Sequence, residues 1–489
     1  MIALVTLPPR MSYVAPLNLA ILKGLISEYD VRCRDLSIEF DAELGKILYD
    51  KRRALNPASL NLGYYPEAMS HAHSSLWSQF KYRSIQYWLV IEYPFQLLEC
   101  KSSDAIDERM HRLFEELADA VLKENPEVVG LSVWGGNLGT TLNVAKILSK
   151  EGTKIILGGS GVYTSYPFLL KYPFIDHFVV GEAELVFKKL INSLLKGEKV
   201  PRLIRSKRFV EMDAIPFPDY DDFDLEKYAT IGTETQRGCV NRCAYCSVRF
   251  KPDGAAYRQK SISRIVKELS FLKKYEMPLY FCDNITNPSK KRIDKLAKAV
   301  TPLNMTWGAE MFPTIDWETA RLLKDAGCHE VWTGCESFSD YMLKRFNRNV
   351  NVKTVVKTLK NLHNAGIKTY GMFFFRSPGE RVRDVFLTAL RMFKYQKYLD
   401  AVLIAYFRPT YGSDVHLHPD KYNIKVRSAE EWTAIHEIVP YQEKSSTSFL
   451  GNTVSIPTVE FLKNYFYYLG KVCVEKKSYY VGEVCVEKR

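Results

Sequence analysis

A chain of 489 residues is longer than a single hydrophobic core usually organises, so the length predicts two or three domains. Its composition, with 46% hydrophobic and 25% charged residues, excludes a disordered, collagenous or coiled-coil protein. The net charge of +12 arises from Lys and Arg scattered among Glu and Asp without a block of like charge, which disfavours a nucleic-acid-binding face. Apolar stretches fall short of the ~20 residues that a membrane span needs, and the opening MIALVTLPPR predicts a strand and no signal peptide. We therefore expect a cytoplasmic protein.

Strand and helix patterns alternate through the first part of the chain. Apolar runs predict strands at residues 2–7, 30–36, 128–133, 154–157 and 177–180. Helical periodicity falls between them, at residues 17–27, 107–123, 141–150 and from Glu184 onward. Strands that are apolar on both faces and are each followed by a helix predict a parallel, doubly wound sheet. We therefore expect an α/β fold in which residues 1–205 form a Rossmann-like domain, with a helical insertion at about residues 40–105.

Glycine-containing turns follow three of these predicted strands. They comprise Gly135, Gly136 and Asn137, then Gly158, Gly159, Ser160 and Gly161, then Gly181 and Glu182. A doubly wound sheet binds ligands at the carboxyl ends of its strands, and glycine lets the backbone approach a ligand closely. These turns therefore predict a cofactor crevice. Pro8 and Pro9 stand where a GxGxxG motif would follow the first strand, which disfavours an ordinary NAD or FAD domain.

A second α/β block follows a linker rich in proline and aspartate, residues 206–230. Strand patterns recur at residues 233–237, 279–282, 305–311, 330–333, 368–375 and 401–407, and helical periodicity at 261–275, 316–326 and 352–365. Six such βα units predict a (β/α)6 partial TIM barrel over residues 231–410, with its site at the carboxyl ends of the strands. Residues 411–489 are expected to form a small mixed region, in which the VCVEK repeat at 472–476 and 484–488 predicts a terminal hairpin.

Three cysteines lie close together just past the first predicted barrel strand. They are Cys239, Cys243 and Cys246, in the stretch TQRGCVNRCAYCSVRF. Structural zinc needs four protein ligands, and no fourth Cys or His lies nearby in the sequence. An iron–sulfur cluster that keeps one iron open for a substrate or cofactor needs only three thiolates. The spacing therefore favours a cluster, with zinc and unligated cysteines as the alternatives.

This stretch resembles the signature of the radical SAM superfamily, CxxxCxxC with an aromatic residue before the last cysteine, here Tyr245. Further matches stand at predicted strand ends: Cys282-Asp283-Asn284, Gly334-Cys335-Glu336-Ser337 and Ser377-Pro378-Gly379-Glu380. Upstream, LGGSGVYTS, FVVGEAE and the linker IPFPDYDDFD resemble the cobalamin-binding domain that precedes the barrel in one branch of the superfamily. Over roughly residues 1–410 the chain thus resembles a cobalamin-dependent radical SAM enzyme of the methyltransferase branch.

The resemblance implies three cofactors and their sites. The three cysteines would hold three irons of a 4Fe-4S cluster, whose fourth iron binds S-adenosylmethionine (SAM). The glycine turns named above, through Glu182, would hold cobalamin. Expected SAM-binding residues are Tyr245, Asp283, Asn284, Glu336, Ser337 and Arg376, and Glu310 and Tyr406 are expected catalytic residues that face the substrate from strand ends. Outside the cysteines, each of these residues has the alternative role of satisfying loop backbone or packing at a strand end.

The implied reaction moves a methyl group from methylcobalamin to an unactivated sp3 carbon, after a 5′-deoxyadenosyl radical has removed hydrogen from that carbon. A low-potential ferredoxin or flavodoxin would supply electrons, and a second SAM would remethylate the cobalamin. The substrate stays open between a protein or peptide, such as methyl-coenzyme M reductase, and a lipid, tetrapyrrole or antibiotic precursor. Two other functions stay open: a cobalamin-binding radical SAM enzyme that catalyses cyclisation, oxidation or carbon–carbon coupling, and a non-catalytic cobalamin or iron–sulfur sensor.

The DxHxxG motif, which supplies a cobalt-ligating histidine in other cobalamin proteins, is missing from the N-terminal half. The resemblance implies that cobalamin is then held base-off and without a histidine. His71 and His73 would reach the cobalt only if the insertion folded over the crevice.

Overall fold

The computed structural model describes residues 1–8, 14–40, 43–44, 47, 104–134, 136–206, 208–248, 257–407, 409–410, 412–426, 441–443, 478–481 and 484–486. The chain forms two compact units, the first ending at Gly232 and the second beginning at Thr233. Residues 206–230, expected as a linker, fall within the first unit. Most of the expected insertion at 40–105, including His71 and His73, lies outside the described residues.

A parallel sheet forms the centre of the first unit, in the order β2-β1-β3-β4-β5-β6. Its strands are β1 (Ile2–Thr6), β2 (Val31–Asp35), β3 (Val128–Ser132), β4 (Lys154–Gly158), β5 (His177–Val180) and β6 (Leu203–Arg205). Every residue of β1 and β5 is buried, as expected for strands that helices cover on both faces. The last strand, β6, has no counterpart among the strands that the apolar pattern predicts.

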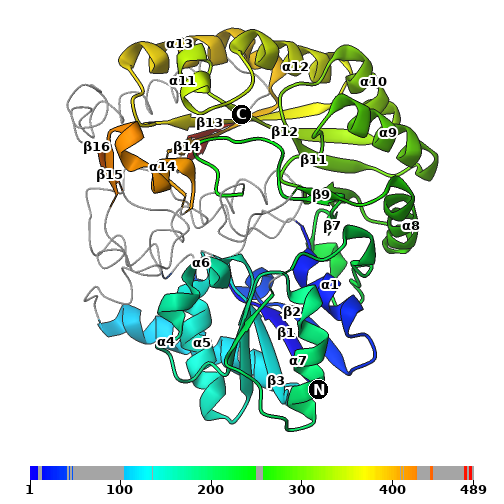
Figure 1. Ribbon diagram of the computed structural model, residues 1–489, viewed down its shortest axis with the longest axis vertical. Helices are drawn as coiled ribbons and strands as arrows, with labels where there is room; N and C mark the ends of the chain where they lie inside the picture. Colours follow the sequence, from blue (N-terminus) through cyan, green and yellow to red (C-terminus); the bar gives the residue numbers. More distant parts are fainter. Residues whose placement is uncertain are drawn as a thin grey trace. The chain divides into compact units, whose positions relative to one another are not determined.

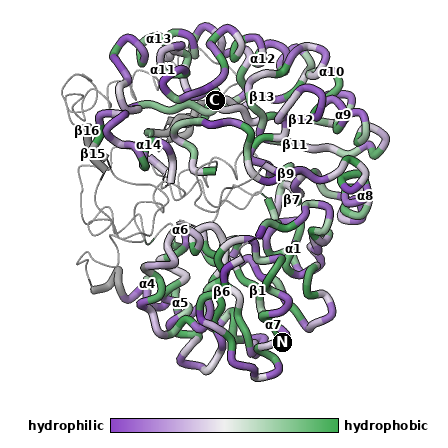
Figure 2. Tube along the Cα trace, viewed as in Figure 1, coloured by the Kyte–Doolittle hydropathy of each residue, from purple (hydrophilic) through white to green (hydrophobic). Residues whose placement is uncertain are grey.

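Helices cover both faces of this sheet (Figure 1). The α-helices are α1 (Leu17–Leu25), α4 (Asp104–Leu122), α5 (Leu138–Lys150), α6 (Ser160–Leu169) and α7 (Phe187–Leu195), and short 3-10 turns lie at Ala183–Leu185, Met212–Ala214 and Leu225–Lys227. The main core lies between the sheet and α4, α5 and α6, and it contains Leu117, Val144 and Ile155. Figure 2 shows hydrophobic residues along the strands and mixed polarity along the outer helices.

The strand order reverses direction between β1 and β3, because the chain proceeds outward from β1 to β2 and then in the opposite direction from β3 to β6. Open α/β sheets bind ligands outside the carboxyl ends of their strands at such a switch point. The turns that follow β3, β4 and β5 are therefore placed where the sequence predicts a cofactor crevice.

A second, larger sheet forms the centre of the second unit, in the order β18-β17-β14-β13-β12-β11-β10-β7. Its strands are β7 (Ile231–Thr233), β10 (Leu279–Phe281), β11 (Trp307–Met311), β12 (Cys328–Glu336), β13 (Lys368–Phe375), β14 (Ala401–Tyr406), β17 (Ser478–Val481) and β18 (Val484–Val486). Neighbouring strands from β10 to β17 are parallel, and only β18 is antiparallel to its partner. Two small antiparallel pairs stand apart, β8 (Gln236–Arg237) with β9 (Arg258–Gln259) and β15 (Ile424–Val426) with β16 (Tyr441–Glu443).

Helices line the outer side of this curved sheet (Figure 1). They are α8 (Ile262–Leu272), α9 (Lys290–Val300), α10 (Trp317–Asp325), α11 (Asp340–Arg345), α12 (Val352–Asn364) and α13 (Val382–Tyr395). The short helix α14 (Asp414–Leu417) does not belong to this row, and its Val415 N donates to the Ala244 carbonyl at 3.1 Å. The 3-10 turns lie at Lys273–Tyr275, Thr301–Leu303, Gln396–Tyr398 and Pro419–Tyr422. Ser261, Ser289, Asp316, Ser339 and Asn351 cap helix N-termini by accepting a backbone N–H bond. Gly327 and Gly366, with φ of +84° and +73°, follow α10 and α12.

The architecture confirms the predicted fold class, a doubly wound parallel sheet followed by a (β/α)6 partial barrel. The predicted strand at 233–237 is wrong in extent, because β7 ends at Thr233 while Gln236 and Arg237 pair with β9. The second copy of VCVEK contributes β18 to an antiparallel pair, whereas the first copy, 472–476, lies outside the described residues. None of the helices in the described ranges has the length and apolarity that crossing a bilayer requires.

Candidate active site

Cys239, Cys243 and Cys246 line one cavity in the second unit, together with residues at the carboxyl ends of the barrel strands. The loop that carries them follows Gly238, whose φ of +79° turns the chain out of β8. Cys239 and Cys243 are buried and Cys246 is half-buried. The cavity has a volume of about 350 Å³, which is within the range of small-molecule sites. Its apolar wall consists of Ile285, Met311, Phe312, Met372, Phe373, Phe374 and Leu403.

The three thiols suit an iron–sulfur cluster better than a single metal ion. Within the described ranges, no three Cys, His, Asp or Glu side chains are spaced to hold one ion. A cluster distributes three thiolates over three irons, so its ligands need not converge on one point. Burial raises the pKa of Cys239, and it raises the pKa of Cys246 to about 12, so both thiols are protonated before metal binds. Cluster assembly at this loop must therefore release protons.

A buried polar network adjoins Cys243. Tyr245 donates its hydroxyl to Glu336 Oε1 at 2.6 Å, and Arg348 Nη1 donates to the Tyr245 oxygen at 2.9 Å. Arg348 Nη1 also lies 3.3 Å from Glu336 Oε1 and 3.7 Å from Cys243 Sγ, while Nη2 donates to the Gly334 carbonyl. The network thus places a cation directly beside a cysteine of the loop.

The geometry of this network is fixed by its surroundings. The Tyr245 ring makes edge contacts with Phe346 and Phe374, with centroid separations of 5.3 and 5.2 Å. The Arg348 guanidinium lies 4.4 Å from the Phe312 ring centroid. Burial raises the pKa of Glu336, while the Arg348 charge and the Tyr245 hydroxyl oppose that rise. Arg348 Nε is buried without a hydrogen-bond partner among the described residues, and a bound anion would satisfy this orphaned donor.

Glu336 itself adopts an uncommon backbone conformation, with φ of +59°. The β12–β13 pairing shifts register between Gly334 and Glu336, so the strand bulges at this point. A side chain at Gly334 would overlap the Glu336 carboxylate. The sequence Gly-Cys-Glu therefore bends the end of β12 so that Glu336 lines the cavity, as the strand-end prediction requires.

Glu310 lies in β11 and lines the same cavity. Its carboxyl group has no hydrogen bond or ion pair with any described residue. Burial raises the pKa of Glu310 to about 7, the Glu336 charge adds to the rise, and Arg348 opposes it. Glu310 is half-buried, and a carboxyl group without a protein partner at a cavity wall is poised to accept a hydrogen bond from a ligand.

The remaining expected SAM-binding and catalytic residues are distributed unevenly. Asn284 lines the cavity, whereas Asp283 and Ser337 are buried in contacts with the protein itself. Ser337 Oγ lies 3.0 Å from Thr388 Oγ1. Arg376 is exposed just after β13, with φ of +59°, and it does not line the cavity. Tyr406 ends β14, but its side chain lies outside the described residues.

In the first unit, Asn137 joins the carboxyl ends of two strands at the switch point. Its Nδ2 donates to the carbonyls of Leu7 (3.1 Å) and Ser132 (3.0 Å), and its Oδ1 accepts from Trp134 N (2.9 Å). Asn137 is fully buried, so its side chain links the ends of these two strands and is not exposed to a ligand. Gly136 adjoins the Trp134 ring, which leaves no room for a side chain, and Gly135 lies outside the described residues.

The turn after β4 exposes backbone at the same edge. Gly159 and Ser160 are exposed and Gly158 is half-buried. Gly159 has φ of +105°, and a Cβ there would collide with the Val133 carbonyl oxygen. After β5, Gly181 is exposed with φ of +94°, and the neighbouring Glu182 carboxylate accepts a bond from Val210 N at 2.6 Å. Exposed glycine backbone at the carboxyl ends of these strands fits a large, flat cofactor such as cobalamin.

Histidines of the first unit do not follow the carboxyl end of a strand in the ranges that the structure describes. His177 begins β5, and its Nδ1 lies 2.9 Å from the Pro201 carbonyl. His111 is exposed on α4.

Replacing Gly159 by Ala is expected to destabilise the first unit by about 1–3 kcal/mol, because a Cβ would strain a glycine-only conformation and clash with backbone. The matched control is Gly152→Ala, since Gly152 also has a positive φ (+81°) but a Cβ there meets no atom within 4 Å. Urea unfolding of both variants measures the difference. Equal losses of stability in the two variants would show that the turn after β4 is not tightly packed.

Arg348 is the main site residue that the sequence does not indicate. It lies between α11 and α12, and not at a strand end, so no motif or periodicity marks it. Its place in the stretch RFNRNV would be typical of an ordinary basic loop.

Comparison with known proteins identifies both units. Residues 233–387 match the family model of the Radical SAM superfamily, and residues 92–191 match that of the B12 binding domain. The chain therefore contains a radical SAM domain and a B12-binding domain, which imply a 4Fe-4S cluster, SAM and cobalamin as cofactors. This confirms the family and the cofactors that the sequence motifs predicted.

Individual relatives are distant. An uncharacterized methyltransferase of Pyrococcus horikoshii is 28% identical over 315 residues, which cover 59% of this chain and 67% of that protein. The radical SAM methyltransferase TsrM of Kitasatospora setae, solved with tryptophan and a SAM analogue, has a similar fold (TM-score 0.58, 15% identity, 88% of this chain and 78% of that chain). The cobalamin-dependent SAM radical enzyme OxsB is also similar (TM-score 0.55, 14% identity, 86% of this chain and 55% of that chain).

Proposed function

We propose that this protein is a cobalamin-dependent methyltransferase that transfers a methyl group to an unactivated sp3 carbon. The observation that carries the proposal is the cavity in which three thiols, the Arg348 cation and the unpaired Glu310 carboxyl meet an apolar wall. The B12-binding domain and a relative named as a methyltransferase support methyl transfer as the outcome. The methyl acceptor is a peptide or protein, such as methyl-coenzyme M reductase, or a small molecule that presents an apolar carbon.

The cysteines, Arg348 and Glu336 have distinct roles in this proposal. Cys239, Cys243 and Cys246 hold the cluster. When bound, the cluster supplies the electron that cleaves SAM, and cobalamin carries the methyl group to be transferred. Arg348 would supply the counter-charge for the SAM carboxylate, and Glu336 holds Arg348 beside Cys243.

The substrate side of the cavity is assigned to other residues. Glu310 accepts a hydrogen bond from the methyl acceptor, and its partnerless carboxyl group supports this role. Tyr406, at the end of β14, is a proposed neighbour of the acceptor. The apolar wall packs against the nonpolar part of the acceptor and positions its target carbon. In the first unit, Gly158, Gly159 and Ser160 are proposed to support cobalamin with exposed backbone.

The proposal predicts that two SAM molecules are consumed per methylation. Reconstituted full-length protein with cobalamin and a low-potential reductant, but no acceptor, is expected to form about one equivalent of S-adenosylhomocysteine per bound cobalamin. With an acceptor deuterated at the target carbon, equal amounts of S-adenosylhomocysteine and deuterium-labelled 5′-deoxyadenosine should accompany product. Mass spectrometry measures all three species.

A second candidate is a cyclisation, oxidation or coupling reaction, which the similarity to OxsB, named as a SAM radical enzyme without reference to methyl transfer, favours. Such an enzyme would form 5′-deoxyadenosine without stoichiometric S-adenosylhomocysteine, and its product would gain no methylene. That pattern would replace the methyltransferase proposal.

A further inference from the structure

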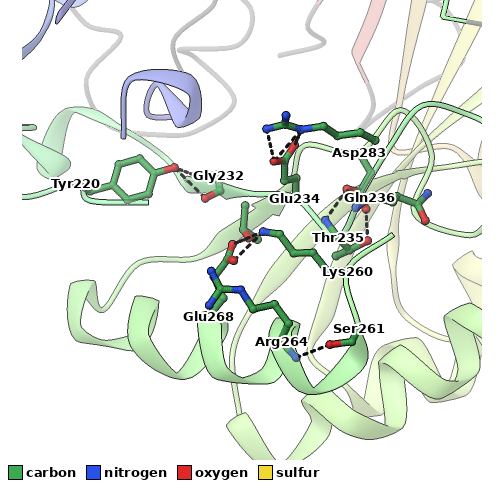
Figure 3. Close-up of polar contacts among 12 residues, drawn as sticks. Tyr220, Gly232, Glu234, Thr235, Gln236, Lys260, Ser261, Arg264, Glu268 and Asp283 are labelled. Carbon is green, nitrogen blue, oxygen red and sulfur yellow. Dashed lines mark hydrogen bonds and ion pairs between the residues drawn. The ribbon is translucent and has the colours of Figure 1, made fainter. Parts of the chain in front are cut away.

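Asp283 follows β10, and one short segment of the chain uses both of its carboxylate oxygens. Oδ1 accepts hydrogen bonds from the backbone N–H groups of Thr235 (2.7 Å) and Gln236 (3.1 Å), and Oδ2 accepts one from the Thr235 hydroxyl (2.6 Å) (Figure 3). Asp283 is 4% exposed and does not line the cavity, although its neighbour Asn284 does. Its carboxylate therefore bonds to the protein's own loop and not to the space in which a ligand would lie.

The segment that Asp283 holds leads directly into the cysteine loop. Gln236 is three residues before Cys239, and its side-chain amide donates to the Ile285 carbonyl on the same β10 end. The Tyr257 hydroxyl donates to Gln236 Oε1 at 2.8 Å, and Lys260 N donates to the Thr235 carbonyl at 2.8 Å. Residues that follow β10 thus hydrogen-bond to the base of the cysteine loop on one side, and residues that flank β9 do so on the other.

The three hydrogen bonds to Asp283 require a carboxylate. Three donors point at one side chain, and a carboxylate alone offers acceptors on both of its oxygens. This arrangement carries an electrostatic cost, because burial raises the pKa of Asp283 to about 6 even though the hydrogen bonds from Thr235 and Gln236 lower it. Without Asp283, the Thr235 and Gln236 N–H groups would be buried and unpaired at the point where β7 has ended.

We propose that Asp283 is a positioning residue that holds the base of the cysteine loop so that Cys239 is presented to the cluster. This inference rests on the proposed role of the three cysteines as cluster ligands. It assigns to Asp283 a contact with the loop backbone in place of a contact with SAM. Groups behind a metal ligand orient it, and their loss commonly weakens metal binding about 10- to 100-fold.

Glu268 provides a matched control at the same end of the barrel. It is a second buried carboxylate, 1% exposed, and it forms an ion pair with Lys260 Nζ at 2.7 Å and accepts a bond from the Thr233 hydroxyl at 2.6 Å (Figure 3). These two partners precede and follow the segment 235–237 and are not part of it. Changing Glu268 therefore perturbs the same region without removing a hydrogen-bond partner of Thr235 or Gln236.

The test compares wild type with D283A, D283E, D283N and E268Q as full-length, anaerobically reconstituted proteins. The measurements are iron content, the rate of iron loss to a chelator, the EPR spectrum of the reduced cluster with and without SAM, and thermal unfolding. D283A and D283E, which remove or displace both oxygens, are expected to lose iron at least about tenfold faster and to show altered EPR spectra. D283N keeps one oxygen for both N–H groups but loses the acceptor for the Thr235 hydroxyl, so its iron-loss rate should lie between those of wild type and D283A. E268Q should unfold at a lower temperature with an unchanged spectrum and iron-loss rate.

Wild-type rates and spectra in both D283A and D283E would overturn the inference, and if D283A does not fold, D283E decides alone. Weaker SAM binding with an unchanged cluster would also overturn it, because Asp283 would then belong to the SAM site. Failure of wild-type protein to bind iron would instead refute the proposed role of the cysteines themselves. The wild-type arm therefore separates failure of the proposed function from failure of this inference.

Discussion

Replacing Cys239, Cys243 and Cys246 together by Ala is expected to abolish both iron binding and the reductive cleavage of SAM. Wild-type protein reconstituted without oxygen should bind about four irons per chain, as a three-thiolate 4Fe-4S site requires. The three side chains line one cavity, and within the described ranges no other group of Cys, His, Asp or Glu is spaced to take over. Iron and sulfide analysis, with chromatography of 5′-deoxyadenosine, measures the loss.

The triple variant is expected to fold, because the main barrel core does not include the cysteine loop. That core is built from residues such as Leu359, Phe373 and Val402, all nearly inaccessible to solvent. The matched control is Cys328→Ala, which removes a fully buried thiol from the start of β12 and should leave the iron content unchanged. Circular dichroism of both variants checks the fold. Cleavage of SAM by the folded triple variant would end the assignment of the cysteines.

The architecture could be predicted because its signal is local and repeated. Residues Val128–Ser132 are nearly all buried between helices, so the strand is apolar at almost every position. Glycines at the ends of α10 and α12 mark where each helix stops. Each βα unit can be recognised in the sequence from these two signals. The number of units then limits the fold to very few arrangements.

The break in the strand at 233–237 could not be predicted from local pattern. Thr235 and Gln236 have their N–H groups bonded to Asp283, a residue far away in the sequence, and not to a neighbouring strand. When a distant side chain accepts the N–H bonds that a neighbouring strand would otherwise accept, the sequence of the bonded segment does not show it. The short β6 escapes prediction for a related reason, because its partly exposed residues at the sheet edge give only a short apolar run.

Sequence motifs identify strand-end residues but not the direction of each side chain. The motif that contains Glu336 places it correctly at the cavity, but its neighbour Ser337 points into the protein and contacts Thr388. Sequence proximity to a strand end therefore selects candidates without saying which way each side chain points. Arg348 could not be found in this way, because it lies in a loop between two helices and only the tertiary fold brings it beside Cys243.

Replacing Arg348 by Met is expected to reduce SAM cleavage by about 10²–10³-fold, which is typical of losing a preorganised charged donor. It should also destabilise the protein by about 3–5 kcal/mol, because Glu336 would remain buried without its cation. R348K keeps the charge but loses the forked guanidinium group that reaches Tyr245, Glu336 and Gly334 together. Its rate of SAM cleavage should therefore fall between those of wild type and R348M. Thermal unfolding and the rate of 5′-deoxyadenosine formation measure these two effects separately.

The double variant R348M/E336Q separates stability from catalysis. Removing both charges eliminates the uncompensated carboxylate, and replacing a whole buried ion pair is often nearly neutral for stability. We therefore expect the double variant to regain most of the stability lost in R348M while cleaving SAM as slowly as R348M does. We expect this difference between stability and SAM cleavage because Arg348 contacts Cys243 and carries the unpaired Nε, whereas Glu336 only holds Arg348 in place. Recovery of SAM cleavage together with stability would show that Arg348 serves only to neutralise Glu336.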